Sequence, residues 1–246
     1  MSSFLGLSKG LVDFDQKSLA VAAASIAFNP IFWNTIARQG IHPPPPRDHP
    51  TQPHAQTCPS TITSCPSHPS LTPASRPAEY HNKVLTKLAG GNSRLACYGL
   101  AVTIFSLGIF RDLLYERALR AQPAHPMLQT PLATTLAYAL LAAGNVLVIS
   151  SMWALGVTGT YLGDYFGILM DEMVTGFPFN VTDAPMYYGS TMSFLGTAIL
   201  FGKPAGVLLT LEVLVVYLIA LRFEDPFTAG IYAKRAREQG EGKKSS

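Results

Sequence analysis

The stretch from Leu132 to Val157 contains no charged residue, and it constrains the fold more than any other part of the chain. About 20 apolar residues in a helix cross the hydrocarbon core of a bilayer, because each residue adds about 1.5 Å. Lipid offers no hydrogen-bond partners, and a helix pairs its own backbone N–H and C=O groups with each other. The run therefore predicts a membrane-spanning helix, and the protein is expected to be an integral membrane protein.

Two further stretches predict spanning helices. The first covers residues 95–110 and can be extended by Tyr115 as an aromatic anchor in the membrane interface, and the second covers residues 205–221. Residues 18–33 are also apolar, but Asn29-Pro30 interrupts them and they fall short of a full span. We expect a membrane-dipping helix there, either re-entrant or interfacial.

A break at Gly202-Lys203-Pro204 divides the last apolar region, residues 193–223. Proline cannot continue a helix that is already under way, so the part before the break is expected to be a short hairpin arm. The predicted fold is an all-α integral membrane protein with three transmembrane helices, one membrane-dipping N-terminal helix and this arm.

Basic residues predict the orientation, because lysine and arginine accumulate on the cytosolic side. The C-terminal tail is rich in them and is expected to be cytosolic. Counting back from it, the third and last spans run in opposite directions and residues 111–130 share the cytosolic side with the tail. Lys83, Lys87 and Arg94 argue against this count, since it places them on the lumenal side.

Composition excludes several other classes of protein. Charged residues make up 13% of the chain, about half the usual share, and the net charge of +3 is too small and scattered for a nucleic-acid surface. The cysteines have neither the number nor the spacing of a disulfide set or a metal site: Cys58, Cys65 and Cys97. The first 17 residues lack the basic start of a signal peptide, so the first helix should remain in the mature protein.

Residues 39–78 differ sharply from the rest of the chain. They are rich in proline, serine and threonine and contain almost no aliphatic residues, so they cannot form a core and are expected to be disordered. The segment is either a tolerated loop insertion or translated intron sequence. The predicted division is an N-terminal segment with an intramembrane helix (1–38), a disordered insert (39–78) and a membrane domain (79–246).

The connection after the third span is long and rich in glycine, proline and aromatic residues, as in Gly163-Asp164-Tyr165-Phe166-Gly167 and Tyr187-Tyr188-Gly189. Polar groups near a bilayer need partners that lipid does not provide, so such a segment suits the binding of a lipid head group. An ordinary interfacial loop with aromatic anchors has the same composition, and both interpretations stay open on composition alone.

Several long motifs resemble the phospholipid N-methyltransferases, in particular the short class that completes phosphatidylcholine synthesis in fungi and animals. The matching segments are Phe28-Asn29-Pro30-Ile31-Phe32-Trp33-Asn34, Gln129-Thr130-Pro131, residues 154–168, residues 185–191 and Glu224-Asp225-Pro226-Phe227-Thr228-Ala229. The resemblance implies methylation of phosphatidyl-N-methylethanolamine and phosphatidyl-N,N-dimethylethanolamine to phosphatidylcholine, with S-adenosylmethionine as co-substrate. It also implies a multi-pass protein of the endoplasmic reticulum membrane, with the mitochondrial membrane as a further location.

The resemblance implies a cofactor site in two parts. The family holds S-adenosylmethionine with a Gly-x-Gly pattern in a membrane helix, which corresponds to Ala142, Ala143 and Gly144, and with an acidic pair, which corresponds to Glu224 and Asp225. Alanine stands at the first glycine, and aspartate at the second acid. Without the resemblance, the first set reads as helix packing and the second as a solvated helix end.

Two competing functions remain at this stage. One is another membrane methyltransferase, such as the prenylcysteine carboxyl methyltransferases, although Asp183-Ala184 stands where that group has Arg-His before the proline. The other is a non-catalytic membrane protein of the same fold. The base that removes a proton from the substrate amine is not identified, and Tyr187, Asp164 and Glu224 are its candidates.

Overall fold

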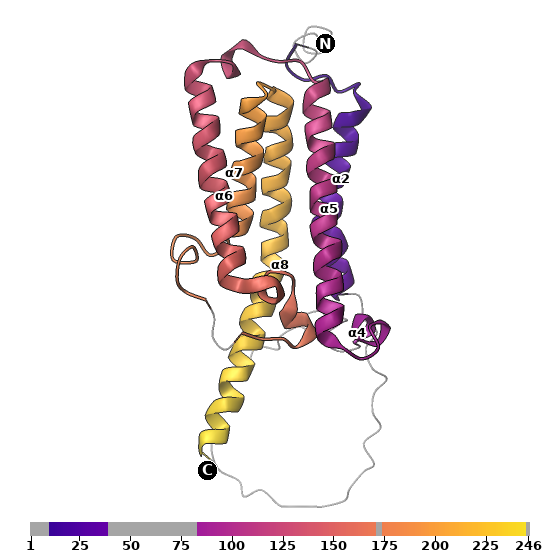
Figure 1. Cartoon of the computed structure of the whole chain (residues 1–246), viewed down its shortest axis with the longest axis vertical. Helices are drawn as coiled ribbons and strands as arrows, with labels where there is room; N and C mark the ends of the chain where they lie inside the picture. Colours follow the sequence, from indigo (N-terminus) through magenta and orange to yellow (C-terminus); the bar gives the residue numbers. More distant parts are fainter. Residues whose placement is uncertain (1–9, 39–82, 171–173, 245–246) are drawn as a thin grey trace, which may run out of the picture.

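The protein, seen in a computed structural model, is described over residues 10–38, 83–170 and 174–244 (Figure 1). Within these ranges all regular structure is helical, which confirms the predicted all-α class. The elements are α2 (Lys17–Arg38), α4 (Val84–Leu88), α5 (Ser93–Ala121), the 3-10 helix η1 (Pro126–Leu128), α6 (Pro131–Thr160), the 3-10 helix η2 (Gly163–Phe166), α7 (Pro185–Leu200) and α8 (Pro204–Lys244). The predicted disordered insert, 39–78, lies outside the described residues.

Three of the described helices are long and apolar enough to cross a membrane: Ser93–Ala121, Pro131–Thr160 and the part of α8 from Pro204 to Pro226. They contain the three predicted spans, so the prediction of an integral membrane protein is confirmed. Only 11% of the most apolar stretch of α6 is buried inside the protein, and the Trp153 side chain is 89% exposed. An apolar surface of this extent suits contact with lipid.

Local sequence signals explain where two of these helices begin. The Asn92 side chain accepts hydrogen bonds from the backbone amides of Arg94 and Leu95 at 3.1 and 3.2 Å, which caps α5. Thr130 caps α6 by accepting from the Ala133 amide at 3.2 Å, and Pro131 occupies the first helical position, where it loses no hydrogen bond.

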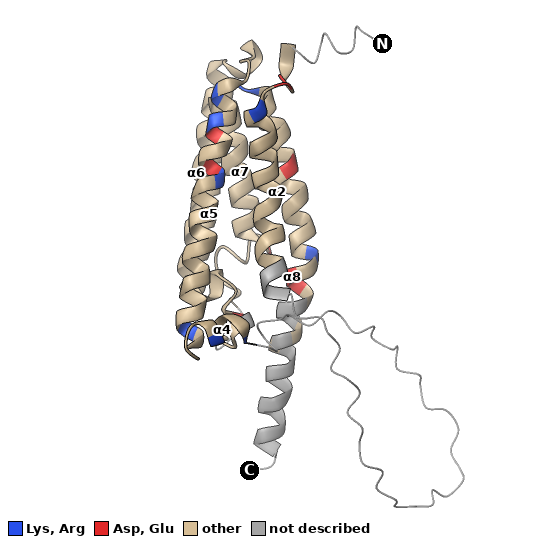
Figure 2. Ribbon diagram, turned by 90° about the vertical axis from the view of Figure 1, so that its right-hand side faces the viewer, with Lys and Arg blue, Asp and Glu red and all other residues tan. Residues whose placement is uncertain are grey.

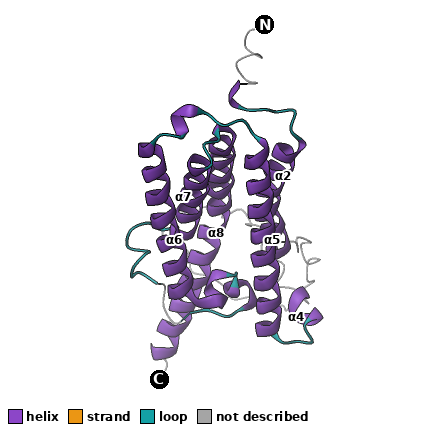
Figure 3. Cartoon of the chain, turned by 45° about the horizontal axis from the view of Figure 1, so that its top comes forward, coloured by secondary structure: helices purple, strands orange, loops and turns teal. Residues whose placement is uncertain are grey.

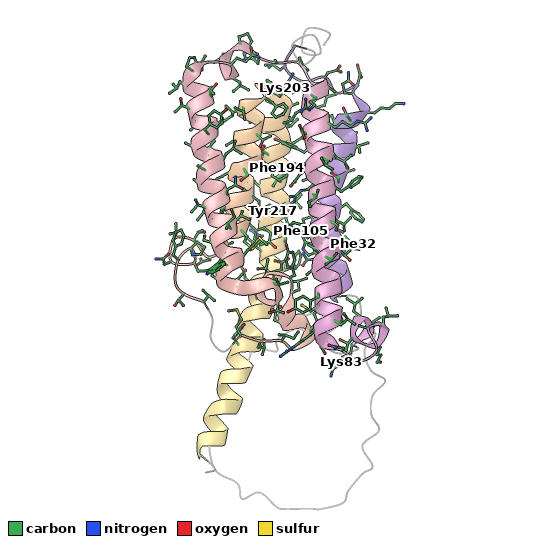
Figure 4. The ribbon with its side chains drawn as sticks, viewed as in Figure 1. Phe32, Lys83, Phe105, Phe194, Lys203 and Tyr217 are labelled. Atoms are coloured by element: carbon green, nitrogen blue, oxygen red, sulfur yellow. The ribbon has the colours of Figure 1, made fainter. Side chains whose placement is uncertain are left out.

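Helices α2, α5, α6, α7 and α8 form one bundle (Figures 1 and 3). Hydrogen bonds between distant segments lie at both of its ends. At one end, Lys203 Nζ donates to the Gln122 carbonyl at 2.5 Å. At the other end, Asn34 Nδ2 donates to Glu224 Oε1 at 2.9 Å. We call these the Lys203 end and the Glu224 end; Figure 4 labels Lys203 at the first and Lys83 near the second.

Helix α7 begins at Pro185, eight residues before the predicted hairpin arm, and runs along α6 back to the Lys203 end. Its first turns contain hydroxyl groups that made the sequence look like a polar loop. These hydroxyls bond carbonyls one turn earlier: Thr191 bonds Tyr187 at 2.8 Å, and Ser193 bonds Gly189 at 3.0 Å. A hydroxyl satisfied in this way is compatible with an apolar environment, so the helix extends through the polar stretch.

The predicted break at Gly202-Lys203-Pro204 forms the turn between α7 and α8. Gly202 has a φ of 66°, a left-handed conformation that glycine adopts without steric cost. Its amide donates to the Ile199 carbonyl at 2.8 Å, and the Lys203 amide donates to the Ala198 carbonyl at 3.0 Å. These bonds close the end of α7 and direct α8 back toward the Glu224 end.

The extra crossing by α7 overturns one step of the predicted topology. Helices α6 and α8 both run from the Lys203 end to the Glu224 end, so the expectation that the third and last spans are antiparallel is wrong. The segment around Gln122 consequently lies at the opposite end of the bundle from Glu224, and not beside the C-terminal tail. The error arose because α7 was counted as a short arm.

Helix α2 is longer than the interrupted apolar stretch suggested. It continues through Pro30 for 22 residues, about 33 Å, and packs on α5 and α8. The buried Asn29 side chain donates to the Leu107 carbonyl of α5 at 3.2 Å. Neighbouring helices thus hold the helix across a proline that would weaken it in isolation. The expected membrane-dipping element therefore connects the two ends of the bundle.

The observed directions place three basic residues on the side of the C-terminal tail, whereas Arg117 and Arg120, near the end of α5, lie toward the Lys203 end. Lys83 and Lys87, beside and within α4, and Arg94, at the start of α5, lie at the Glu224 end, toward which α8 also runs (Figure 2). The sequence-based count had placed them opposite the C-terminal tail. A basic bias at one end is typical of the cytosolic side of a membrane protein.

A buried core joins α2, α5, α7 and α8. It is lined by Leu19, Ala22, Ile26, Tyr115, Ala118, Leu119, Phe194, Ala205, Leu209, Val213 and Tyr217. Gly206 lets α8 approach closely, since a Cβ there would lie 2.6 Å from both Ala198 Cβ and Leu119 Cδ2. The Tyr115 ring packs edge-on against Phe194 with centroids 4.7 Å apart, and its hydroxyl reaches the Phe194 and Gly206 carbonyls at 2.9 and 3.2 Å.

Replacing Tyr115 by phenylalanine is expected to destabilise the bundle by about 1–2 kcal/mol, because the buried hydroxyl ties α5 to both α7 and α8. Thermal unfolding in detergent micelles would measure the loss. Tyr138→Phe is the matched control, since that side chain is 59% exposed on α6. Equal unfolding temperatures for the two variants would show that the Tyr115 hydroxyl does not stabilise the bundle.

Candidate functional site

Three helices converge on the carboxylate of Glu224. The Tyr187 hydroxyl of α7 donates to Glu224 Oε2, and Asn34 Nδ2 of α2 donates to Glu224 Oε1 at 2.9 Å. The Tyr187 ring packs edge-on against the Tyr217 ring of α8, with centroids 4.8 Å apart. We call Asn34, Tyr187, Tyr217 and Glu224 the Glu224 cluster. Residues from both sides of the 39–78 insert thus form one site.

The Glu224 cluster continues toward the middle of the bundle through Arg111 of α5. Arg111 Nη1 donates to the Tyr217 hydroxyl at 2.7 Å, and Nη2 forms an ion pair with Asp112 at 2.9 Å. The guanidinium also lies over the Phe194 ring, 4.8 Å from its centroid; Figure 4 labels Phe194 and Tyr217. The Arg111 side chain is only 12% exposed. A cation inside a membrane bundle is costly unless it is paired, and these three partners supply the pairing.

Asp225 follows Glu224 on α8 but is exposed, whereas Glu224 is half-buried. The two acids therefore differ in surroundings: Glu224 is held by α2 and α7, and Asp225 faces outward near the end of the spanning part of α8. Carboxylate oxygens can each accept more than one hydrogen bond, so both residues retain acceptor capacity for a ligand.

The predicted small residues of α6 do not share one environment. Gly144 is buried against α7, where a Cβ would lie 2.5 Å from the Gly189 carbonyl oxygen and 2.6 Å from Ser193 Oγ. Ala142 and Ala143 are exposed on the other sides of the helix. Close packing against α7 explains the glycine at position 144, whereas Ala142 and Ala143 lie on the part of the α6 surface that no other described helix covers.

Helix α7 connects the two halves of the predicted cofactor site. Gly144 packs against Gly189, and Tyr187, two residues before Gly189, bonds Glu224. The α6 residues and the acidic pair are thus linked through the first turns of α7. Three members of the surroundings were missed from the sequence: Asn34, Arg111 and Tyr217. Asn34 and Arg111 could have been found from the sequence, because a polar residue inside or beside a predicted membrane segment is a candidate functional residue.

Asp164, a candidate base from the sequence, and Tyr161 lie near the start of α5. Asp164 is on η2, whose Phe166 packs with Ala96, Cys97 and Leu100 of α5. Tyr161, just after α6, accepts a hydrogen bond from Cys97 Sγ on its carbonyl at 3.7 Å. Burial raises the pKa of the Tyr161 phenol above its ordinary value, so that side chain stays protonated at neutral pH.

Long apolar helices with a polar cluster at one end define a multi-pass, all-α membrane protein. The model of the phospholipid methyltransferase family matches residues 132–235, which include α6, α7 and most of α8. The phosphatidyl-N-methylethanolamine N-methyltransferase of Neurospora crassa is 57% identical over 228 residues, 93% of this chain and 88% of that protein. The chain belongs to the phospholipid methyltransferase family, and it is a methyltransferase enzyme.

Further relatives agree with this assignment. The phosphatidyl-N-methylethanolamine N-methyltransferase of Saccharomyces cerevisiae is 48% identical over 224 residues, 91% of this chain and 89% of that protein. The human phosphatidylethanolamine N-methyltransferase is 40% identical over 227 residues, 92% and 94% of the two chains. No solved structure matches the chain. These relatives support neither the prenylcysteine alternative nor a non-catalytic protein.

Proposed function

We propose that this enzyme transfers methyl groups from S-adenosylmethionine to phosphatidyl-N-methylethanolamine and phosphatidyl-N,N-dimethylethanolamine, and so produces phosphatidylcholine. The observation that carries the proposal is the 57% identity, over nearly the whole chain, to a protein named for the monomethylated lipid. The Glu224 cluster supports it, because polar and acidic side chains inside a membrane bundle suit a cationic head group.

The proposed cofactor site combines Ala142, Ala143 and Gly144 with Glu224 and Asp225. S-adenosylmethionine, when bound, supplies a methyl group on a positively charged sulfur. The residues fit such a ligand, because the exposed Asp225 carboxylate and the Glu224 carboxylate can accept hydrogen bonds from its amino and ribose groups. The open alanines allow close approach to α6, and Gly144 acts by bringing α7 against α6.

The chain's own contribution to the reaction is mainly positioning. Methyl transfer requires the amine lone pair to point at the methyl group. An enzyme that holds the two reactants in this geometry lowers the activation barrier, because the entropy of bringing them together is lost on binding. In this enzyme, α6 and α8 hold the methyl donor S-adenosylmethionine, and Tyr187 of α7 faces the substrate amine. The rings of Tyr187 and Tyr217 add faces that attract a methylated ammonium.

The Glu224 end of the bundle is proposed to face the cytosol. Basic residues of α4, of the start of α5 and of the C-terminal part of α8 support this orientation. The site then opens toward the side from which a soluble co-substrate arrives. The endoplasmic reticulum membrane is the proposed location, with the mitochondrial membrane as a further one.

The proposed domain organisation keeps the division at 1–38, 39–78 and 79–246. The family match at 132–235 lies inside the third part. Helix α2, within the first part, nevertheless contributes to the same bundle, because it packs on α5 and α8 and Asn34 bonds Glu224. We propose that the N-terminal helix completes the methyltransferase site.

The test is a lipid methylation assay with the full chain in proteoliposomes and labelled S-adenosylmethionine. Vesicles containing the monomethylated or dimethylated lipid should yield labelled phosphatidylcholine, and a farnesylated cysteine peptide should remain unlabelled. The protein with Glu224 and Asp225 both replaced by alanine is the negative control. Label that appears only when unmethylated phosphatidylethanolamine is supplied would show that the assignment to the later steps is wrong.

A further inference from the structure

Tyr187 occupies the point where the cluster meets the first turn of α7. Its hydroxyl donates to Glu224 Oε2, and Asn34 donates to the other oxygen of the same carboxylate at 2.9 Å. The ring is fixed by the edge-on contact with Tyr217, whose own hydroxyl accepts from Arg111 at 2.7 Å. The phenol is thus held in one orientation by residues from α2, α5 and α8.

We propose that Tyr187 is the proton acceptor for the substrate amine and that Glu224 receives the proton through it. This inference rests on the proposed function. The ammonium head group must lose a proton before its nitrogen can attack a methyl group, and a side chain in hydrogen-bond reach has to accept that proton. A tyrosine that donates to a carboxylate still has lone pairs on its oxygen for a second partner, here the ammonium N–H.

One N–H proton of the head group moves to Tyr187 Oη while the original hydroxyl proton of Tyr187 moves to Glu224 Oε2. The freed nitrogen lone pair forms the new N–C bond to the methyl carbon, and the electrons of the broken C–S bond remain on sulfur. Glu224 then releases its proton to water, so Tyr187 returns to its starting state.

The charges around Tyr187 suit this transfer. Among the described residues, the titratable groups around Tyr187 are Glu224, Asp225 and Tyr217 from α8, with Asp183 of the segment before α7 beside Asp225 and Arg111 of α5 behind Tyr217. Helix α2 contributes the uncharged Asn34. The acids favour binding of the cationic head group, and Arg111 is already paired with Asp112. The proton that Glu224 takes up keeps the total charge of the site unchanged while the positive charge of the methyl donor passes from sulfur to nitrogen.

The geometry also separates Tyr187 from the other candidates for the base. Asp164 lies on η2 beside the start of α5, where it is not part of the Glu224 cluster. Both oxygens of Glu224 are directed into bonds with Asn34 and Tyr187, so a head group reaches this carboxylate most directly through the phenol. The structure therefore joins two of the three candidates into one pathway.

The test compares Tyr187→Phe with Tyr188→Phe in the full chain. Phenylalanine keeps the ring contact with Tyr217 but cannot carry a proton, whereas Tyr188 is 39% exposed and has no part in the cluster. At neutral pH, Tyr187→Phe should lower kcat on the monomethylated lipid by roughly 100-fold, and Tyr188→Phe should leave it within about twofold. The defect should shrink as pH rises, because more head groups have already lost their proton.

A second readout is independent of turnover. Infrared difference spectra are recorded when the monomethylated lipid binds to protein saturated with S-adenosylhomocysteine, which has no methyl group to transfer. The wild type should show a new protonated carboxyl signal that disappears in Glu224→Gln and in Tyr187→Phe. A purely structural role of Tyr187 would not produce this signal.

The outcomes distinguish the inference from the proposed function. A pH-independent defect in Tyr187→Phe, or a carboxyl signal unchanged by that substitution, would overturn the relay even if the wild type methylates lipid. A wild type that binds no S-adenosylmethionine and labels no lipid would instead overturn the proposed function. S-adenosylhomocysteine affinity within about threefold of wild type shows that Tyr187→Phe is correctly folded. If it is not, the wild-type spectrum decides: the absence of a protonated carboxyl signal, or a signal that persists in Glu224→Gln, overturns the relay.

Discussion

Replacing both Glu224 and Asp225 by alanine is expected to abolish binding of S-adenosylmethionine while the protein still inserts in the membrane. The double variant removes both carboxylates of the proposed cofactor site, and charge-assisted hydrogen bonds of this kind contribute more than neutral ones. The two residues follow the apolar part of α8, so the spanning segment keeps its hydrophobicity. Equilibrium binding of labelled S-adenosylmethionine in proteoliposomes measures the effect.

Glu116→Ala is the matched control for the double variant. Glu116 is an acid on α5 whose ion pair with Arg120 is solvent-accessible and contributes little to stability. The single variant Asp225→Ala isolates the exposed acid, since it leaves the bonds from Tyr187 and Asn34 to Glu224 intact. Unchanged cofactor affinity in the double variant would remove both acids from the site.

Replacing Gly144 by valine is expected to separate α6 from α7 and to destabilise the protein by about 3 kcal/mol or more. A Cβ at position 144 would lie 2.5 Å from the Gly189 carbonyl oxygen, which is backbone and cannot rotate away. Overpacking of a well-packed contact costs about 1–3 kcal/mol, and a rigid backbone neighbour places the cost at the upper end of that range. Thermal unfolding in detergent micelles and the yield of folded protein would record the loss.

Gly108→Val is the control for this prediction. Gly108 is also a helical glycine, on α5, but a Cβ there would meet nothing within 4 Å. Both substitutions carry the same β-branched side chain into a membrane helix, so the difference between them reports the contact with α7. Comparable unfolding temperatures would show that the α6–α7 approach has room for a side chain.

The three spanning helices could be predicted because their signal is local. Leu132–Val157 is strongly hydrophobic and carries no charged residue, and such a run is stable in a bilayer as a helix. The break at Gly202-Lys203-Pro204 was likewise readable, since a glycine before a proline marks a turn. The resemblance placed Glu224 and Asp225 among the cofactor residues, and that assignment stays a prediction.

Helix α7 could not be delimited in the same way, because whether a hydroxyl-rich segment enters the membrane depends on the partners of its polar groups. Thr191 and Ser193 bond carbonyls of their own helix, and Gly189 allows α6 to approach. Periodicity and hydropathy do not record such bonds. Because this crossing was missed, α6 and α8 were predicted to run in opposite directions, whereas they run in the same direction.

The sequence by itself determined the three spanning segments of α5, α6 and α8, because their length, their hydropathy and the satisfaction of their backbone amides are properties of each segment alone. Only the tertiary structure decided what the polar residues do. Asn34 and Glu224 are 190 residues apart, and their hydrogen bond exists because α2 packs beside α8. Gly144 is a packing residue for the same reason: a neighbouring helix, and not its own sequence context, occupies the space a side chain would need.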